Sequence, residues 1–375
     1  MTVDVDPNLL GMLRPDANPA AESHAKAFEF TGSPVRVRVG IGALSSIAED
    51  CRVLGLKRVM VVASPSLRSV AETLSRDMGG NSAGVISSGQ RDTPQSAVDA
   101  TLAAMMKAGA DGVVAVGGGS TIGLGKTIAA NTDIRLIAVP STYSGSEMMQ
   151  NWYVGAGQDR YGGKSVKALP QLAIYDPEAS RSLPSKIAAA SGMNAMAHAV
   201  ESLYGPDTNP VIVRVALDAI GLLSVNLPKI VDNPDDMDAK ARVAHAGWAA
   251  AAFRAKSGIE HALAQRIRQW FQLDHAQTHA VMLPYALAFN KPAIPDVYAR
   301  LSNALCGDDA ALALHQLNKR LGLATGLADL GFDPDSLGRA TDIVADGSWV
   351  NPRVATRADL LEILSQAIRG AAPRH

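Results

Sequence analysis

The chain is poor in cysteine and in net charge, and it lacks long uninterrupted apolar runs. Cys51 and Cys306 are its only cysteines, so a disulfide framework and a cysteine metal site are excluded and a reducing cytoplasm is favoured. A formal net charge of −1 supplies no basic field for nucleic acid or an anionic membrane surface. No apolar stretch has the length needed to span a bilayer. We therefore predict a cytoplasmic protein that binds neither nucleic acid nor membrane.

What the chain has is enough apolar residues, 47% of its 375 residues, to form the cores of two domains. Residues 1–30 contain acids and prolines without a long apolar core, which predicts a loosely ordered extension and not a signal peptide. We predict an α/β nucleotide-binding domain over residues 31–184 and an all-helical domain over residues 185–375, with the site in a cleft between them.

The predicted α/β domain rests on strand-like runs that alternate with helical patterns. Strand, turn and helix in repetition predict a mostly parallel sheet that binds its ligands at the carboxyl ends of the strands. The segment STYSGSEMM at 141–149 takes the place of a helix in this alternation. After Pro184 the sequence changes to long alanine-rich helical patterns, and one of them runs through residues 239–271. The strand-like runs are 35–39, 58–63, 113–116, 135–140 and 172–176.

A glycine-rich stretch, GGGSTIGLGKT at 117–127, follows the third of these strands. It is not an ATP-binding P-loop, because Ser120 stands where the motif requires its first glycine. It also departs from the dinucleotide fingerprint, because Ile122 stands where that motif has a small residue. Three glycines still let a ligand approach the backbone, and Ser120 or Thr121 is expected to cap a helix whose free N–H groups favour an anion. The alternative is a glycine-rich turn that holds no ligand.

Several histidines of the helical segment are spaced to share helix faces. Asn194 and His198 are four residues apart, and so are His275 and His279, while His261 precedes His275 by fourteen residues. A single alanine-flanked histidine is more often a satisfied core residue. A set of imidazoles that lines a cleft, however, is typical of binding or catalysis.

The order and spacing of several short stretches resemble the iron-containing alcohol dehydrogenase family, and within it the maleylacetate reductases. The resemblance implies a dehydroquinate synthase-like or iron-type alcohol dehydrogenase fold, with an α/β dinucleotide-binding domain of mostly parallel sheet and an all-α C-terminal domain. It also implies a homodimer, and it extends from about Gly32 to the C-terminus. The stretches are VGGGSTIGLGKTIA at 116–129, VPSTYSGSEM at 139–148, LPQLAIYDPEASRSLP at 169–184, SGMNAMAHAVESLY at 191–204, DHAQTHAVMLPYALAFN at 274–290 and VNPR at 350–353.

The resemblance also assigns a cofactor site to the glycine-rich turn. It implies that the turn holds the pyrophosphate of a nicotinamide dinucleotide. Ser64 stands where an acid often binds the ribose hydroxyls, and Arg68 is nearby, so we expect NADPH to be accepted alongside NADH. The alternative is that these two are ordinary turn and helix residues. The predicted cofactor residues are Gly117, Gly118, Gly119, Ser120, Thr121, Ser141, Thr142 and Ser146.

The metal-dependent members of the family use an aspartate and three histidines, which match Asn194, His198, His261 and His275. Asparagine lacks the charge that helps hold a divalent ion, and maleylacetate reductases also carry asparagine there. We therefore expect activity without tightly bound metal. The chain departs from its relatives at positions close to His261. Gln265 replaces a usual histidine, Arg268 and Gln269 replace a glycine pair, and Glu260 stands where reductases often have another histidine.

The resemblance predicts an NAD(P)H-dependent reductase of maleylacetate or a similar oxo-dicarboxylate in aromatic-compound catabolism. Its predicted catalytic residues are Asn194, His198, His261, His275 and His279, and its predicted substrate residues are Tyr143, Lys164, Lys167 and Arg353. For each of the cations, the alternative is a solvated surface side chain. Two alternatives to the function also stay open: a related oxidoreductase acting on another carbonyl or alcohol, and a member that kept the fold as a non-redox enzyme or binding protein.

Overall fold

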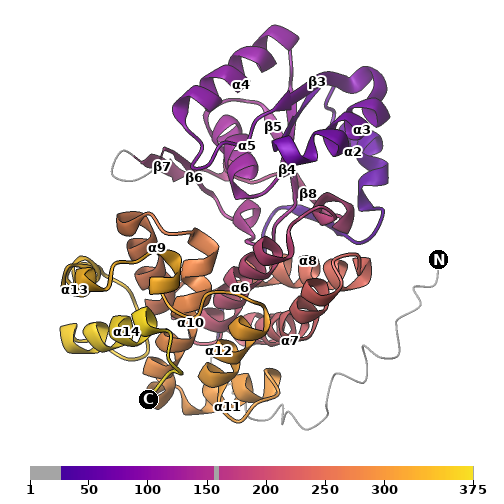
Figure 1. The fold of residues 1–375 in the computed structure, drawn as a ribbon. Coiled ribbons are helices and arrows are strands. Elements are labelled where there is room, and N and C mark those ends of the chain that lie inside the picture. Colours follow the sequence, from indigo (N-terminus) through magenta and orange to yellow (C-terminus); the bar gives the residue numbers. More distant parts are fainter. Residues whose placement is uncertain (1–26, 156–159, 375) are drawn as a thin grey trace. The chain divides into compact units, whose positions relative to one another are not determined.

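The computed structural model describes residues 27–155 and 160–374. Most of the predicted extension, residues 1–30, thus lies outside the described residues. In the part that is described, a sheet of six strands is followed along the chain by a series of helices (Figure 1). Its strands are β1 (Arg36–Val39), β2 (Val59–Ala63), β3 (Ser82–Ser87), β4 (Gly112–Gly117), β5 (Arg135–Pro140) and β8 (Leu172–Tyr175).

The sheet is parallel throughout, with the order β1-β8-β5-β4-β2-β3. The inner strands β2, β4, β5 and β8 are buried on both faces, whereas the edge strands β1 and β3 are partly exposed. Alternate residues of the inner strands enter two different cores. Val61 and Val114 pack with the core of α2 (Ile47–Val53) and α3 (Arg68–Met78). Val62 and Val113 pack with the core of α4 (Gln95–Ala108) and α5 (Gly119–Asn131). The predicted parallel α/β fold is therefore confirmed.

Two parts of the sheet region differ from the sequence prediction. The strand β3 and the antiparallel hairpin of β6 (Asn151–Val154) and β7 (Tyr161–Lys164) were not predicted. The segment 141–149 contains only one turn of 3₁₀ helix, Ser146–Met148. The glycine at position 145 explains this, because its φ of +71° interrupts a helical path.

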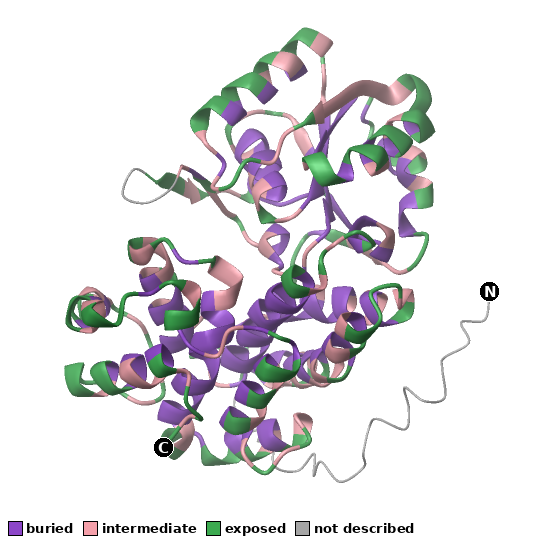
Figure 2. Ribbon diagram, in the orientation of Figure 1, coloured by how far each residue is buried: buried purple, intermediate pink, exposed green. Residues whose placement is uncertain are grey.

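Helices form the rest of the described chain. The helices α6 and α10 are the most buried of them, as the purple ribbons of Figure 2 show. The pattern predicted as one helix over 239–271 is two helices, α8 and α9, separated by residues 253–258. The domain boundary at residue 184 stays a prediction. The helices are α6 (Ser185–Ser202), α7 (Pro210–Asp232), α8 (Met237–Ala252), α9 (Ile259–Phe271), α10 (His275–Asn290), α11 (Pro295–Ala304), α12 (Ala310–Arg320), α13 (Leu337–Ala345) and α14 (Arg357–Arg369).

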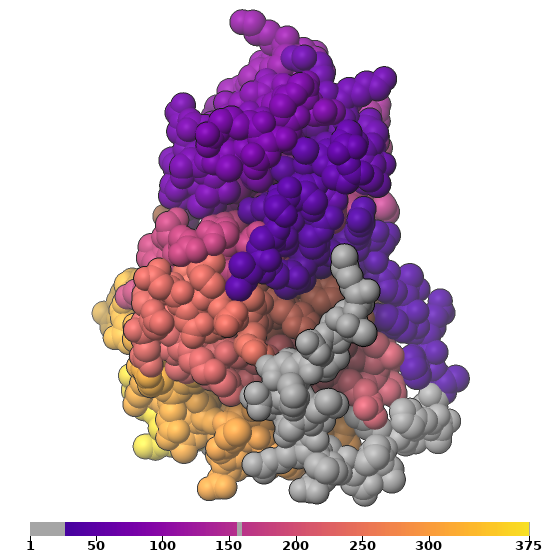
Figure 3. Space-filling model, turned by 90° about the vertical axis from the view of Figure 1, so that its right-hand side faces the viewer, coloured from indigo at the N-terminus to yellow at the C-terminus, as the bar shows by residue number. Residues whose placement is uncertain are grey.

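The helix α7 is, among the described residues, the one helix long and apolar enough to cross a membrane. Packing accounts for part of this composition, because 39% of its most apolar stretch is buried. Leu223 and Leu227 are fully buried in the core that α7 shares with α6 and α8. Gly192 of α6 lets α7 approach closely, since a Cβ there would lie 2.3 Å from Leu227 Cδ2. The other side of α7 is part of the rose-to-salmon surface in Figure 3.

Candidate functional site

The glycine-rich turn joins the carboxyl end of β4 to the first turn of α5. Gly118 is the N-cap of α5 and no side chain caps the helix, so the expected capping by Ser120 or Thr121 is wrong. The first amide bonded back along the helix is that of Ile122, which donates to Gly118 O at 3.0 Å. A Cβ on Gly119 would meet no atom within 4 Å. The turn thus presents an open, uncapped helix N-terminus, which suits an anionic group such as a phosphate.

The loops after the neighbouring strands lie beside this turn. Ser141 N–H donates to Gly117 O at 2.9 Å, and Ser64 N–H donates to Val116 O at 3.1 Å. From β2 the chain continues to one side of the sheet, to β3, and from β4 it continues to the other side, to β5. The carboxyl ends of β2 and β4 are therefore a topological switch point, where open α/β sheets bind nucleotides.

The loop over residues 141–146 is held in place by buried contacts. Lys126 Nζ donates to Ser146 O at 2.5 Å, and Ser191 Oγ accepts from Tyr143 N–H at 2.7 Å. Gly145 packs against α8, because a Cβ on it would lie 2.1 Å from Ala251 Cβ. Burial lowers the pKa of Lys126 to about 8. This lysine of the Gly-Lys-Thr sequence thus supports the backbone of a second loop, a role unlike that of a P-loop lysine.

The predicted histidines come together in one row. His198 and His261 have ring centroids 4.4 Å apart, His261 and His279 are 4.6 Å apart, and His279 and His275 are 4.7 Å apart. Asn194 lies one turn before His198 on α6. Asp274 caps α10 by accepting from Gln277 N–H, and the helix then begins at His275. Three helices that are separate in the sequence therefore supply one row of imidazoles.

Two buried glutamates hold the middle of this row. Glu201 Oε2 lies 2.8 Å and Glu260 Oε2 lies 2.7 Å from Nδ1 of His261. Glu260 Oε1 lies 2.9 Å from Nδ1 of His279. Glu201 also accepts the N–H groups of Gly258 and Glu260 at 3.0 and 2.8 Å, so a residue of α6 caps α9. Both imidazoles therefore direct Nδ1–H toward carboxylates and turn Nε2 the other way.

The carboxylates also decide which histidine carries charge. Burial alone would lower the pKa of His261, but the charges of Glu260 and Glu201 outweigh it and raise this pKa to about 9. Burial would raise the pKa of Glu260, but His279 and His261 lower it to about 2. Burial, reinforced by the neighbouring histidines, lowers the pKa of His198 and of His275. At neutral pH the row therefore combines a cationic His261 with neutral imidazoles at His198 and His275.

The outer atoms of the row have no hydrogen-bond partner among the described residues. They are Asn194 Oδ1, His198 Nδ1, His261 Nε2 and His279 Nε2, and all four are buried. Buried polar atoms are nearly always hydrogen-bonded. This concentration of unpartnered atoms is therefore the mark of a site that binds a polar group of a ligand.

The donor set differs from that of the metal-dependent relatives. Asn194 supplies a neutral oxygen where those relatives have a charged aspartate. One group of possible ligand atoms within 4.8 Å of one another consists of Glu260, His261 and His279. These atoms already bond one another through Nδ1. Metal-independent activity stays a prediction.

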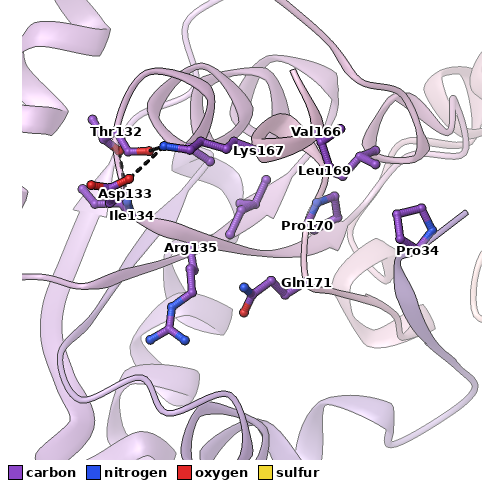
Figure 4. A pocket seen from close by; sticks show the side chains of 12 residues that line it. Pro34, Thr132, Asp133, Ile134, Arg135, Val166, Lys167, Leu169, Pro170 and Gln171 are labelled. Atoms are coloured by element: carbon purple, nitrogen blue, oxygen red, sulfur yellow. Dashed lines mark hydrogen bonds and ion pairs between the residues drawn. The ribbon is translucent and has the colours of Figure 1, made fainter. Parts of the chain in front are cut away.

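Two of the predicted substrate cations, Lys167 and Arg353, have partners away from the histidine row. Lys167 Nζ pairs with Asp133 at 2.8 Å and lines a cavity of about 360 Å³ at the amino ends of β1, β5 and β8 (Figure 4). Arg353 donates to Phe289 O at 2.9 Å and lies 3.2 Å from Asp359. Lys164 is exposed at the end of β7. None of the histidines lines that cavity.

Tyr143, the remaining predicted substrate residue, is buried, and burial raises its pKa to about 12.

The sequence prediction missed several residues near the row. Glu201 lies three residues after His198 and seven after Asn194, so helical spacing could have placed it on their face. Glu260 was noted as a departure but not as a partner of two histidines. Arg254 lies in the interruption between α8 and α9, and the periodic alanine pattern concealed this interruption.

Comparison with known proteins gives consistent matches along the chain. Residues 34–177 match the family described as iron-containing alcohol dehydrogenase, and residues 188–368 match its C-terminal part. Maleylacetate reductase from Sphingobium indicum is 34% identical over 348 residues, which cover 92% of this chain and 99% of that protein. Maleylacetate reductase 1 from Rhodococcus opacus is 36% identical over 352 residues, with coverage of 92% and 98%.

Solved structures agree with these sequence matches. The crystal structure of maleylacetate reductase from Agrobacterium tumefaciens superposes with a TM-score of 0.88 at 33% identity, and the match covers 93% of this chain and 100% of that chain. The structure of sulfoacetaldehyde reductase from Bifidobacterium kashiwanohense in complex with NAD⁺ has a TM-score of 0.84 at 24% identity, with coverage of 91% and 99%. This second likeness concerns the fold alone.

Proposed function

Because the chain belongs to the iron-containing alcohol dehydrogenase family, we propose that it reduces maleylacetate or a similar oxo-dicarboxylate with NADH or NADPH. It is an oxidoreductase, similar over nearly its whole length to maleylacetate reductases. The observation that carries the proposal is the environment of His261, whose Nδ1 lies between two carboxylates while its Nε2 is buried and unpartnered. We also propose a cytoplasmic homodimer that acts in aromatic-compound catabolism.

The proposed cofactor site is the uncapped start of α5. The pyrophosphate would accept hydrogen bonds from amides of Gly119, Ser120 and Thr121, with Gly117 and Gly118 keeping the approach free of side chains. Ser141, Thr142 and Ser146 extend this site along the second loop, whose backbone Lys126 holds. When bound, the reduced nicotinamide supplies a hydride.

The row of imidazoles provides the rest of the chemistry. Hydride addition to the carbon–carbon double bond of a 4-oxo-2-enedioate moves negative charge onto the conjugated ketone oxygen. His261 donates a hydrogen bond to this oxygen from Nε2–H, which its charged state makes available. A proton delivered from the row to the carbon next to the ketone completes the reduction. The negative charge of the transition state is thus stabilised by an imidazolium, with no step that passes through a metal ion.

Cofactor oxidation, followed by absorbance, tests this function. The purified protein is mixed with NADH or NADPH and maleylacetate, and product analysis should find the saturated oxo-dicarboxylate. A panel of simple aldehydes serves as the comparison. Turnover of aldehydes but not of maleylacetate would favour a related carbonyl reductase. Cofactor binding without turnover of any of them would favour a member that has lost redox chemistry.

A further inference from the structure

Two arginines, Arg254 and Arg268, are close to the histidine row. In the described part of the chain, neither has hydrogen-bond partners for all of its guanidinium nitrogens. Arg254 lies in the interruption over residues 253–258, and this segment is fixed to the end of α6. Ala255 N–H donates to Ser202 Oγ at 3.0 Å, and Lys256 N–H donates to Asp207 Oδ1 at 2.7 Å. Ser202 Oγ in turn donates to His198 O. The backbone that carries Arg254 is therefore held within one helical turn of His198.

The guanidinium of Arg254 is half-buried, and no described residue forms an ion pair or hydrogen bond with it. Glu201, the acid that acts most strongly on Arg254, already accepts from His261 and from two backbone amides. Burial lowers the pKa of Arg254, and its charge in turn lowers the pKa of both His198 and Lys126. The charge of Arg254 therefore acts on both the first histidine of the row and Lys126, which supports the loop over residues 141–146.

Arg268 stands near the other end of the row. It lies seven residues after His261 on α9. Its Nη2 donates to Asp92 Oδ1 at 3.0 Å, while its Nε is buried without a partner in the described part of the chain. Its positive charge contributes to the lowered pKa of His275. Asp92 has a φ of 62° and the next residue, Thr93, a φ of 48°. Backbone in this left-handed region is costly for such residues and is often kept for function.

The half-buried guanidinium of Arg254, which forms no ion pair with a described residue, and the buried, unpartnered Nε of Arg268 are costly unless a ligand supplies an acceptor. Guanidinium groups bind carboxylates in a planar, two-pronged geometry that suits recognition. We propose that Arg254 and Arg268 each bind one carboxylate of a dicarboxylate substrate, so that its reactive carbons lie along the row from His198 to His275. This assignment rests on the proposed function and gives it a basis for selecting dianionic substrates. It replaces Lys164, Lys167 and Arg353 as the expected carboxylate partners.

The test combines variants of the two arginines with substrates that lack one carboxylate. Arg254→Gln and Arg268→Gln should each raise KM for maleylacetate at least tenfold, equivalent to about 1.4 kcal/mol, with the KM for the nicotinamide cofactor changed less than threefold. Arg254→Lys and Arg268→Lys should recover part of the loss. Arg357→Gln, which removes an exposed arginine paired with Asp342, is the matched control and should leave both constants unchanged.

The two monomethyl esters of the substrate assign each arginine to one end. The ester that lacks the carboxylate bound by Arg254 should bind the wild-type protein poorly, and the Arg254→Gln variant should bind this ester no more weakly than wild type does. The Arg268→Gln variant should bind the same ester more weakly than wild type does. For the other ester, Arg268→Gln should cause no further loss of affinity and Arg254→Gln should cause one. Equal losses for both esters in both variants would mean that the arginines act through general charge, and would overturn the assignment.

Binding of adipate, a saturated dicarboxylate, separates this inference from the proposed function because it needs no turnover. Calorimetry with the cofactor-loaded protein should give a dissociation constant that rises at least tenfold in either glutamine variant. If wild type binds adipate in this way but does not reduce maleylacetate, the proposed function fails and the two-arginine site stands. If wild type reduces maleylacetate and both variants keep its KM, the function stands and the two-arginine site is wrong. If wild type neither binds adipate nor turns over, both are wrong.

Discussion

Replacing Glu260 by glutamine should move the alkaline limit of activity toward neutral pH. Glu260 contacts Nδ1 of both His261 and His279, and Glu201 is the second carboxylate at His261. The other titratable groups that face His261 are the imidazoles of His198 and His279, whose rings lie 4.4 and 4.6 Å away. These contacts make His261 the group whose charge depends most directly on the two glutamates.

The size of the shift follows from these contacts. An opposite charge at this distance raises a pKa by about 1–3 units. The pKa of His261 is raised to about 9, so removal of one carboxylate should bring it to roughly 6–8. The donating form is the imidazolium, which exists below this pKa. The turnover rate should therefore be retained at low pH and lost as pH rises through about 9 in wild type, and at a lower pH in the variant.

The assay is kcat at saturating cofactor and substrate, measured from pH 6 to pH 10. At pH 8.5 the variant should turn over about tenfold more slowly than wild type, with a smaller difference at pH 6.5. Glu201→Gln should likewise move the alkaline loss of kcat to lower pH. Glu178→Gln, which removes an exposed carboxylate paired with Arg181, is the control. If the pH at which kcat falls on the alkaline side is the same in Glu260→Gln, Glu201→Gln and wild type, a cationic His261 is not the hydrogen-bond donor.

Three further predictions concern the row and the cofactor site. His261→Ala and His198→Ala should each lower kcat at least about tenfold while cofactor affinity stays within a few-fold, since one lost transition-state hydrogen bond costs about 2.7–4 kcal/mol; unchanged kcat with a lower Tm would show that these are core histidines. Untagged protein should contain no stoichiometric iron or zinc and should stay active after exhaustive chelation; activity that one added ion restores would contradict this. Arg68→Ala should raise KM for NADPH several-fold and leave KM for NADH unchanged, because the exposed pair of Arg68 with Glu72 holds it only weakly; a strong preference of wild type for NADH would count against it.

The parallel sheet could be predicted because its strands are apolar runs bounded by turns. Val113 to Val116 is such a run, and so is Leu172 to Tyr175. The strand β3, with the sequence SAGVIS, carries no such signal and depends on pairing with β2. Helical periodicity likewise predicted α6 and α10, but it could not detect the interruption after Ala252. That interruption exists because side chains of α6 bind its amides, which is tertiary information.

The histidines that lie together could be predicted from the sequence, but their protonation could not. Spacing and resemblance indicated His198, His261 and His275. Two carboxylates on one imidazole, however, depend on α6 and α9 meeting, and residues 201 and 261 are sixty positions apart. The same limit applies to Arg254 and to Nε of Arg268, because the folded neighbourhood decides whether these groups meet a hydrogen-bond partner.

The segment over residues 253–258 has a consequence for engineering this protein. Its amides are bound by Glu201, Ser202 and Asp207, all at or just after the end of α6. The segment therefore takes its conformation from a helix that lies far away in the sequence. Exchanging α9 and its preceding loop with a relative would transfer substrate preference only if the last turn of α6 were exchanged with it. Under the two-arginine proposal the unit of specificity in this chain is discontinuous, and a chimera cut between α8 and α9 alone would separate its two halves.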